Sequence, residues 1–335
     1  GSSGTPVAVA TNWQAWVRTL ARRQHLFRRH GLVYGHREAR CWGRSSDGGV
    51  SVMDRLLSRR RFPFESSDPV ERGRELDALI AFRPSYVYGY PSVVSTMLEE
   101  LERRGDRALP LDGVVLTAER ISTQLMTKIE GAVGRPPVRE YGCSETDIIA
   151  FDCPAGSYHV ATDHVIVEVV DAEDGIGQAV VTDLDNTLMP LIRYRLGDRL
   201  RLSSEPCGCG LTSPVIASIE GRIDRKRYFI MPDGRRRHGT FFIYFVEDLA
   251  AKGLPVRHFK IRQTAVDQVV IHLDLGGESL REGMADALQQ RLREELGFAV
   301  CVRFEVAPLH RIPGSKWAAF EGLDAPDGPA SDDQG

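Results

Sequence analysis

The sequence predicts an α/β protein in which a parallel sheet covered by helices is followed by antiparallel strands and then by a small α+β unit. Three observations predict it. Between residues 68 and 141, short apolar runs alternate with helical patterns, the order typical of a parallel sheet. From residue 158 the apolar residues alternate as in antiparallel strands. From about Asp224, helix and strand patterns mix as far as about residue 322.

The first half of the chain opens with a helix that Thr11 can cap and that Gly31 ends. Its apolar residues, among them Trp13, Trp16 and Phe27, recur at helical spacing. Prolines, glycines and capping residues then separate the alternating elements. These are expected as a helix at 68–83, a strand at 86–90, a helix at 91–104, a strand at 112–117, a helix at 122–133 and a strand at 138–141.

The second half changes twice in pattern. Antiparallel strands are expected at 159–170, 178–183 and 191–202, with a turn at 174–177. The small unit should hold a hairpin around 232–234, helices at 242–252 and 278–296, and strands at 256–263, 267–274 and 299–306. We therefore expect a large domain at 1–223, a small domain at 224–322 and a disordered tail at 323–335, which is rich in Asp, Pro, Gly and Ser.

Composition limits the class of protein. The 335 residues suffice for about two domains, and 42% hydrophobic and 27% charged residues are ordinary for a globular chain. A net charge of −3 argues against a nucleic-acid partner. No apolar run reaches the roughly 18 residues that a membrane span needs. The six cysteines are too few and too unevenly spaced for a disulfide framework. A cytoplasmic enzyme or binding protein is expected.

Three segments carry residues suited to a nucleotide. The first six residues form a loop of glycines and hydroxyls that can wrap phosphates, although Gly-Ser-Ser-Gly is also a common cloning remnant. After the strand at 138–141, Tyr141 can stack on a purine, and Ser144 with Glu145 can hold Mg²⁺ against a phosphate. The alternative there is a polar turn that caps a helix. Asp198 follows a glycine turn and can accept hydrogen bonds from a ribose diol, unless the turn only closes a hairpin.

In this order and at these spacings, the segments resemble the adenylate-forming superfamily, and in it the branch of phenylacetate–CoA ligase, coenzyme F390 synthetase and CapK-like proteins. The segments 88–92, 116–120, 221–224 and 311–316 share the resemblance, which covers residues 1 to about 320. It implies the large domain of that superfamily in partial form, followed by its small, mobile lid domain. It also implies ATP-dependent activation of a carboxylic acid as an acyl-adenylate, release of pyrophosphate, and transfer to CoA or another acyl acceptor.

The resemblance also assigns roles to single residues. It implies that the β- and γ-phosphates are bound by Ser2, Ser3, Gly4 and Thr5. It implies that Ala118 and Glu119 lie along the adenine, that Glu140 faces the adenine amino group, and that Tyr141 stacks on the ring with Gly142 and Cys143 beside it. It implies that Asp198 and Arg222 bind the ribose. The implied catalytic residues are Lys316, which touches the carboxylate and α-phosphate, and Ser144 with Glu145, which hold phosphate and Mg²⁺. Asp224 matches the hinge of the small domain.

Three other functions stay open from the sequence. One is adenylyl transfer of the coenzyme F390 synthetase type, in which AMP remains on the product. Another is a non-catalytic protein that binds nucleotide or a partner. This alternative arises because relatives carry a further segment before the phosphate loop, which a separate chain could supply. Trp13, Trp16 and Phe27 are where surplus apolar surface is then expected. The third is a zinc-containing nucleic-acid binder, which the net charge disfavours.

A metal site is predicted independently of the nucleotide segments. Cys207 and Cys209 are separated by one residue, and Cys153 and His159 lie upstream. Four cysteine and histidine ligands in two short clusters suit tetrahedral zinc. Because four protein ligands leave no open position, the role would be structural. The alternative is a pair of thiols in a turn and a histidine on a strand.

Three further features have a simpler interpretation and a functional one. Cys143 lies inside the nucleotide segment and could be mistaken for a nucleophile, but a packing role is the preferred interpretation. The first helix carries several arginines on one face, which could grip phosphates but are expected to be solvated or paired with acids elsewhere. These arginines are Arg18, Arg22, Arg23, Arg28 and Arg29. A basic run at Arg235–His238 could meet a CoA phosphate or a carrier protein, although a solvated turn is preferred.

Overall fold

The computed structural model describes residues 8–33, 35–42, 52–64, 66, 68–105, 108–222, 228–232, 234, 236–238, 240–280, 283–296, 300–309 and 319–323. Contacts divide the chain into two compact units, with a boundary between Gly221 and Arg222. Each unit has its own sheet and its own hydrophobic core. The mixed α/β fold with a large and a smaller sheet confirms the predicted fold class.

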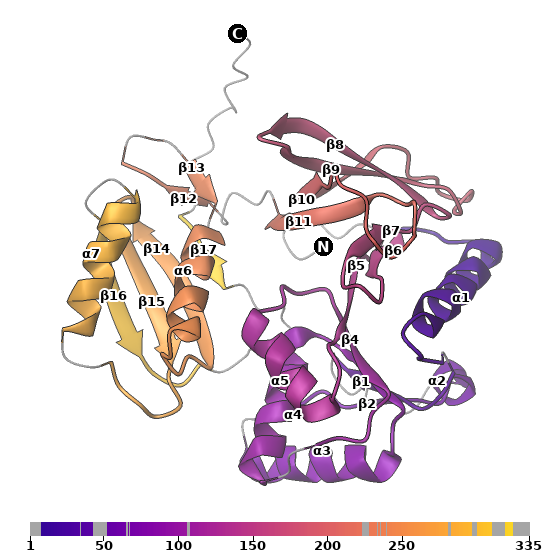
Figure 1. The fold of residues 1–335 in the computed structure, drawn as a ribbon, viewed down its shortest axis with the longest axis horizontal. Coiled ribbons are helices and arrows are strands. Elements are labelled where there is room, and N and C mark those ends of the chain that lie inside the picture. Colours follow the sequence, from indigo (N-terminus) through magenta and orange to yellow (C-terminus); the bar gives the residue numbers. More distant parts are fainter. Residues whose placement is uncertain are drawn as a thin grey trace. The chain divides into compact units, whose positions relative to one another are not determined.

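Five parallel strands begin the large sheet of the first unit (Figure 1). Their order in the sheet is β2 (Arg59–Arg61), β1 (Glu38–Cys41), β3 (Tyr86–Gly89), β4 (Gly113–Thr117) and β5 (Val138–Cys143). Strands β3, β4 and β5 match the expected ones, whereas β1 and β2 have no counterpart among the predictions. Gly89 must be glycine, because a Cβ there would lie 2.6 Å from the Cys41 carbonyl oxygen on the neighbouring strand.

Three helices cover one face of this parallel part. They are α3 (Pro69–Phe82), α4 (Pro91–Arg103) and α5 (Thr123–Val133), each within one or two residues of its predicted bounds. Side chains of Asp68 and Ser122 accept hydrogen bonds from the first turns of α3 and α5, which fixes where these helices begin. Buried residues such as Met97, Leu116 and Ile129 form the core between helices and sheet.

The same sheet continues with antiparallel strands beyond β5. Their order is β6 (Asp147–Asp152), β7 (Tyr158–Val160), β11 (Val215–Arg222), β10 (Tyr194–Leu202), β9 (Ile176–Asp183) and β8 (Val165–Glu173), which completes eleven strands. Antiparallel pairing therefore starts at Asp147 and not at residue 158 as predicted. The strand expected at 159–170 is two strands, because a turn at Thr162–His164 divides β7 from β8. Strands β6 and β11 were not predicted.

Helix α1 (Trp13–Arg28) packs on the face of the sheet opposite α3 to α5, and a short helix α2 (Val52–Leu56) follows. The side chain of Asn12 caps α1, so the predicted cap at Thr11 is wrong by one residue. Phe27 is fully buried against Tyr86 and Phe151, which contradicts its expected place on a surplus apolar surface. Trp13 is 70% exposed, as expected.

The described part of the second unit holds a four-stranded sheet, a two-stranded hairpin and two helices, close to the predicted pattern. Its sheet has the order β16 (Cys301–Val306), β15 (Gln268–Asp274), β14 (His258–Ala265) and β17 (Phe320–Glu321), beside a hairpin of β12 (Tyr228–Ile230) and β13 (Arg236–His238). Helices α6 (Thr240–Ala251) and α7 (Met284–Leu296) bury Phe242, Val246 and Leu292 against Ile261 and Ile271.

Candidate functional site

The turn that joins β5 to β6 presents Ser144 and Glu145. Strand β5 bulges between Tyr141 and Gly142, and the chain reverses over Ser144–Thr146 before β6 begins. Gly142 permits this geometry, because a Cβ there would meet the Asp147 carbonyl oxygen at 2.2 Å. The close approach at Gly142 therefore fixes the backbone conformation of the turn, which sets where the Ser144 hydroxyl and the Glu145 carboxylate lie.

Replacing Gly142 by alanine should lower the free energy of unfolding by about 1–3 kcal/mol, because the methyl group forces the hairpin apart. Gly131→Ala is the matched control, since a Cβ at that helical glycine would meet nothing within 4 Å. It should leave stability unchanged or raise it by up to about 1 kcal/mol. Urea denaturation of both variants decides this, and equal stability of the two would contradict the tight fit at Gly142.

Tyr141 and Asp198 meet across the antiparallel part of the sheet. The Tyr141 hydroxyl donates a hydrogen bond of 2.8 Å to Asp198 Oδ2. Asp198 lies where the register of β10 shifts between Arg195 and Arg199, and such a bulge turns a side chain away from the regular alternation. Nearby, the Tyr194 hydroxyl lies 3.4 Å from Glu145 Oε1. The structure thus gathers the residues predicted for the purine, the ribose and Mg²⁺.

Ala118 and Glu119 follow the carboxyl end of β4. Ala118 is exposed and has a φ of 68°, a left-handed conformation that is strained for alanine. Glu119 Oε2 accepts a hydrogen bond of 2.9 Å from the Ser92 backbone N–H, at the start of α4. This contact joins the predicted adenine loop to the segment 88–92, which shares the sequence resemblance.

Glu140 lies apart from Tyr141, because consecutive residues of β5 point to opposite faces of the sheet. Its carboxylate accepts hydrogen bonds from the hydroxyls of Tyr88 (2.6 Å) and Thr117 (3.2 Å) and lies 3.8 Å from the Arg23 guanidinium. Burial raises the pKa of Glu140, and the Arg23 charge opposes that rise. The predicted contact with an adenine amino group does not fit this buried position, which is a structural one.

Cys143 has the properties of a packed thiol. Its Sγ lies 3.3 Å from Thr146 Oγ1, across the turn. Burial raises its pKa to about 11, so the nucleophilic thiolate is scarce at neutral pH. The packing interpretation of Cys143 fits the structure better than a nucleophilic role.

Several predicted residues lie outside the described part of the chain. This holds for the phosphate loop, the hinge, the terminal lysine and the predicted disordered tail, and for the side chain of Arg222 at the end of β11. The described residues show nothing of the roles predicted for Ser2, Ser3, Gly4, Thr5, Asp224 and Lys316.

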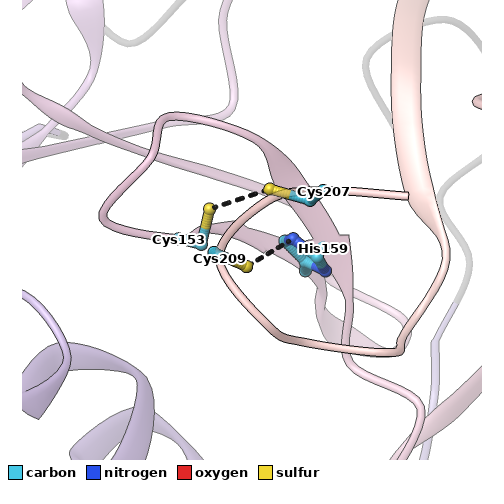
Figure 2. A group of neighbouring side chains, drawn as sticks. All are labelled: Cys153, His159, Cys207 and Cys209. Carbon is cyan, nitrogen blue, oxygen red and sulfur yellow. Dashed lines mark hydrogen bonds between the residues drawn. The ribbon is translucent and has the colours of Figure 1, made fainter. Parts of the chain in front are cut away.

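The four predicted metal ligands come together between two loops. Figure 2 shows Cys153 and His159 from the β6–β7 segment facing Cys207 and Cys209 from the loop between β10 and β11. Their ligand atoms all lie within 4.8 Å of one another. Cys153 Sγ is 3.8 Å from Cys207 Sγ, and Cys209 Sγ is 3.3 Å from His159 Nε2. Zn–S bonds of about 2.3 Å in a tetrahedron give sulfur–sulfur separations of about 3.8 Å.

The surroundings of the cluster also suit a metal. His159 Nδ1 lies 3.1 Å from both the carbonyl and the hydroxyl oxygen of Ser213, and its donation to the carbonyl leaves Nε2 free of a proton. A hydrogen bond with Ser157 is the largest of the influences that lower the pKa of Cys207 to about 6. A thiolate and a fixed imidazole tautomer are what zinc needs from its ligands.

Three of the five arginines, Arg18, Arg22 and Arg23, are paired with acids, as the simpler interpretation expects. Arg23 Nη2 contacts Asp147 Oδ1 at 2.6 Å, and Arg22 Nη2 contacts Asp185 Oδ2 at 2.7 Å. Arg22 and Arg23 are both buried, so they form part of the interior and do not offer an exposed phosphate grip. Their partners are not predicted by the sequence. The only local signal was the run Asp183–Asn186, whose short polar side chains favour a turn.

Among the described residues, no helix has both the length and the apolar character to cross a membrane. No family model matches the chain. A phenylacetate–CoA ligase of Thermus thermophilus is 33% identical over 173 residues, which are 47% of this chain and 39% of that protein. Protein CapK of Staphylococcus aureus is 21% identical over 94% of this chain and 71% of its own length. The chain spans about two fifths of the length of the curated phenylacetate–CoA ligases that it matches.

Solved structures of acyl-CoA and acyl-adenylate ligases share the fold. A 2-hydroxyisobutyryl-CoA ligase in its postadenylation state aligns over 96% of this chain and 72% of its own, with a TM-score of 0.73 and 18% identity. An ATP-bound RpMatB-BxBclM chimera aligns over 96% and 65%, with a TM-score of 0.61 and 14% identity. The chain is therefore similar in sequence to phenylacetate–CoA ligase and to CapK, and it has the fold of acyl-CoA and acyl-adenylate ligases.

Proposed function

We propose that the protein activates a carboxylic acid with ATP, forms an acyl-adenylate and pyrophosphate, and transfers the acyl group to CoA. The observation that carries the proposal is the hydrogen bond between Tyr141 and Asp198, which joins the two elements expected to hold adenine and ribose. The phenylacetate–CoA ligases among the relatives support the reaction class.

The chemistry of the turn supports Mg²⁺ as a cofactor in this proposal. Ser144 is exposed and Glu145 half-buried, and both offer oxygen atoms, which Mg²⁺ prefers together with phosphate. When bound, Mg²⁺ would neutralise charge on the phosphates during the attack of the carboxylate. In this proposal the protein holds the ion with Glu145 and Ser144, and it holds the purine and the ribose with Tyr141 and Asp198.

The small domain predicted from the sequence at 224–322 has a part in the same proposal. Lys316 would contact the carboxylate and the α-phosphate during adenylation, and the domain from Asp224 to about residue 322 would move about that hinge between the two half-reactions. Adenylation joins two anions, so the barrier is largely electrostatic and a lysine at the α-phosphate lowers it.

The test is ATP–pyrophosphate exchange with a panel of carboxylic acids, combined with ATP binding by Asp198→Ala. Removing Asp198 takes a charged acceptor from the ribose, so ATP binding should weaken by about 1.5–3 kcal/mol, or about 10- to 150-fold. Asp77→Ala is the control, because Asp77 lies on α3 and pairs only at the surface with Arg104. Unchanged ATP affinity in Asp198→Ala would contradict the ribose role, and a product that keeps AMP would show adenylyl transfer.

We also propose that the four-ligand cluster holds one structural zinc ion. Cys153, His159, Cys207 and Cys209 supply all four positions of a tetrahedron, so no position remains for a substrate or a water. The ion would fasten the loop before β11 to the start of β7. The zinc would therefore stabilise the antiparallel part of the sheet and take no part in the chemistry.

A further inference from the structure

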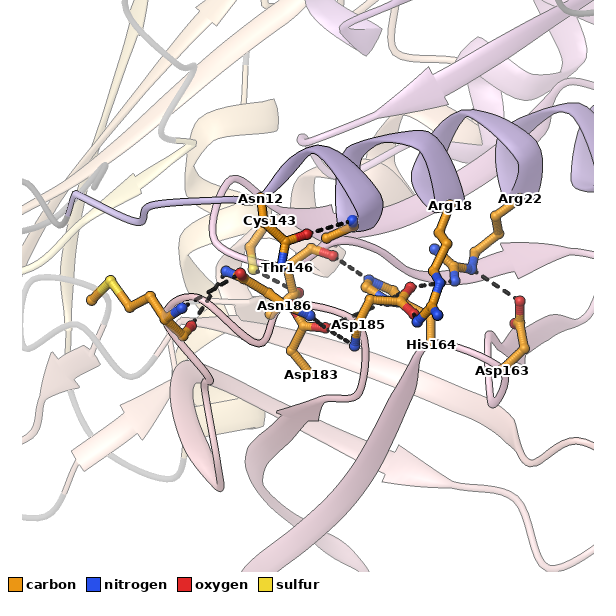
Figure 3. A network of polar contacts seen from close by, with 12 residues as sticks. Asn12, Arg18, Arg22, Cys143, Thr146, Asp163, His164, Asp183, Asp185 and Asn186 are labelled. Carbon is orange, nitrogen blue, oxygen red and sulfur yellow. Dashed lines mark hydrogen bonds and ion pairs between the residues drawn. The ribbon is translucent and has the colours of Figure 1, made fainter.

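A buried network of polar side chains lies beneath the turn that carries Ser144 and Glu145 (Figure 3). It joins three parts of the first unit: helix α1, the turn after β5, and the segments on either side of β8 and β9. Nothing in the proposed reaction uses these residues. The buried members are Arg22, Thr146, His164, Asp183, Asp185 and Asn186, and the exposed ones are Arg18 and Asp163.

His164 is the centre of this network and lies between two hydrogen-bond acceptors. Its Nδ1 is 3.0 Å from Asp185 Oδ2, and its Nε2 is 2.5 Å from the Thr146 carbonyl oxygen. A carbonyl oxygen can only accept, so Nε2 must carry a proton. If Asp185 is ionised, its oxygen too can only accept, and Nδ1 must carry the second proton.

The surroundings of Asp185 keep it ionised. Burial alone would raise its pKa, but hydrogen bonds from Arg22 and Arg18 outweigh burial and hold the pKa below its usual value. Both carboxylate oxygens are engaged, since Arg18 Nη1 lies 3.0 Å from Oδ1 and Arg22 Nη2 lies 2.7 Å from Oδ2.

The buried charges of the network favour a further cation. Two buried carboxylates, those of Asp183 and Asp185, lie beside one buried guanidinium group, that of Arg22, whereas Arg18 and Asp163 are exposed. His164 Nδ1 lies 3.6 Å from Asp183 Oδ1 and 3.0 Å from Asp185. A doubly protonated ring at His164 balances the buried negative charge, whereas a neutral ring leaves an excess of it.

We propose that His164 is a positioning residue whose imidazolium ring holds the Thr146 carbonyl and thereby fixes the turn that presents Ser144 and Glu145. Thr146 ends this turn, and Cys143 contacts the Thr146 hydroxyl from the other end. The catalytic consequence, better placement of Mg²⁺ and phosphate, rests on the proposed function. The clamp on the turn does not.

The protonation state is tested in the unmodified 335-residue chain by ¹⁵N NMR of the histidine rings. The resonances that disappear in His164→Gln identify the ring of His164. Both nitrogens should show the shift of a protonated nitrogen at neutral pH. One protonated and one unprotonated nitrogen would overturn the proposal, whether or not the chain reacts with ATP.

The clamp is tested by hydrogen exchange of the amides at 143–146. His164→Leu removes both donors and should speed exchange in the turn by about 10-fold. His164→Gln keeps one N–H for the Thr146 carbonyl and should restore part of the protection. His25→Gln, an exposed histidine on α1, should exchange like the unmodified chain. Equal protection of the turn in the Leu variant and the unmodified chain would overturn the clamp.

A kinetic readout separates the clamp from the proposed reaction. In pyrophosphate exchange, His164→Leu should raise the half-saturating Mg²⁺ concentration about 10-fold, the usual size of an indirect effect on a metal site. The affinity for AMP, which is held through Tyr141 and Asp198, should stay within about twofold. If the unmodified chain lacks exchange activity, the reaction fails while the NMR and hydrogen exchange still decide the clamp. An equal loss of AMP and Mg²⁺ binding would overturn the positioning role.

Discussion

Replacing Arg23 by methionine is expected to lower the free energy of unfolding by about 3–5 kcal/mol, the usual cost of removing one partner from a buried ion pair. Arg23 is 8% exposed and joins α1 to the sheet through three groups. Its Nη1 donates to the Tyr88 hydroxyl at 2.8 Å, and its Nη2 contacts Asp147 at 2.6 Å. The same guanidinium faces the Glu140 carboxylate, which cannot reach water when Arg23 is gone.

The loss of stability in Arg23→Met should grow with pH, which distinguishes an electrostatic cause from lost packing. The pKa of Glu140 is already raised in the folded protein, and removing Arg23 raises it further. The folded state then keeps a proton that the unfolded chain releases above about pH 4.5, so stability falls as the pH rises through the folded pKa. Urea denaturation at pH 5 and pH 8 should therefore show the larger difference from the unmodified protein at pH 8.

Two variants control this prediction. Arg28→Met changes an exposed arginine of the same helix and should stay within about 0.5 kcal/mol of the unmodified protein. The double variant Arg23→Met with Glu140→Gln removes both charges and should recover most of the lost stability. A loss below about 1 kcal/mol in Arg23→Met alone would show that the ion pair contributes little.

Replacing Cys209 by serine is expected to remove zinc and about 4 kcal/mol of stability together. The proposed zinc would close a chain segment in which Cys153 and Cys207 are 54 residues apart, and a cross-link over a segment of that length removes about 4 kcal/mol of chain entropy from the unfolded state. Metal binding and folding are linked, because the ligands do not form a site in the unfolded chain.

Metal analysis of the purified protein should find one equivalent of zinc, and well under half an equivalent in Cys209→Ser. A strong chelator should lower the melting temperature of the unmodified protein to that of the variant. Cys301→Ser is the control, because Cys301 is exposed on β16 in the other unit. Unchanged stability on chelation, with little zinc in the unmodified protein, would leave the cysteines as ordinary turn residues.

Features that depend on residues close together in the sequence were predictable, and features that depend on distant residues were not. The fold class and the bounds of α3 to α5 were predictable because caps, prolines and apolar spacing are local signals. The gathering of Cys153, His159, Cys207 and Cys209 was predictable because they lie in two short clusters of uncommon residue types. Strand β6 was missed because its apolar residues follow directly on the nucleotide segment, and nothing local shows that the chain has turned back beside β5.

The long-range polar partners were beyond prediction for a physical reason. Arg22 pairs with Asp185, which is 163 residues away, and neither residue carries a local mark of the other. The resemblance placed Glu140 at the adenine. In the structure, the alternation of side chains along β5 directs Glu140 to the face of the sheet that α1 covers. The role of His164 depends on two acceptors that only the folded chain supplies, the Thr146 carbonyl and the Asp185 carboxylate.

The docking of α1 has a consequence for folding during synthesis on the ribosome. The Asn12 side chain contacts Thr187, 175 residues later, and Asn186 contacts the Ala10 carbonyl. At about 5–20 residues per second, roughly 10–35 s pass between the synthesis of α1 and that of its partners. Until Asp185 is made, Arg22 lacks its buried acid, so α1 completes its docking only after the segment that follows β9 has been synthesised. Nascent chains that end before residue 183 should therefore keep α1 open to proteases, and chains that extend past residue 190 should protect it.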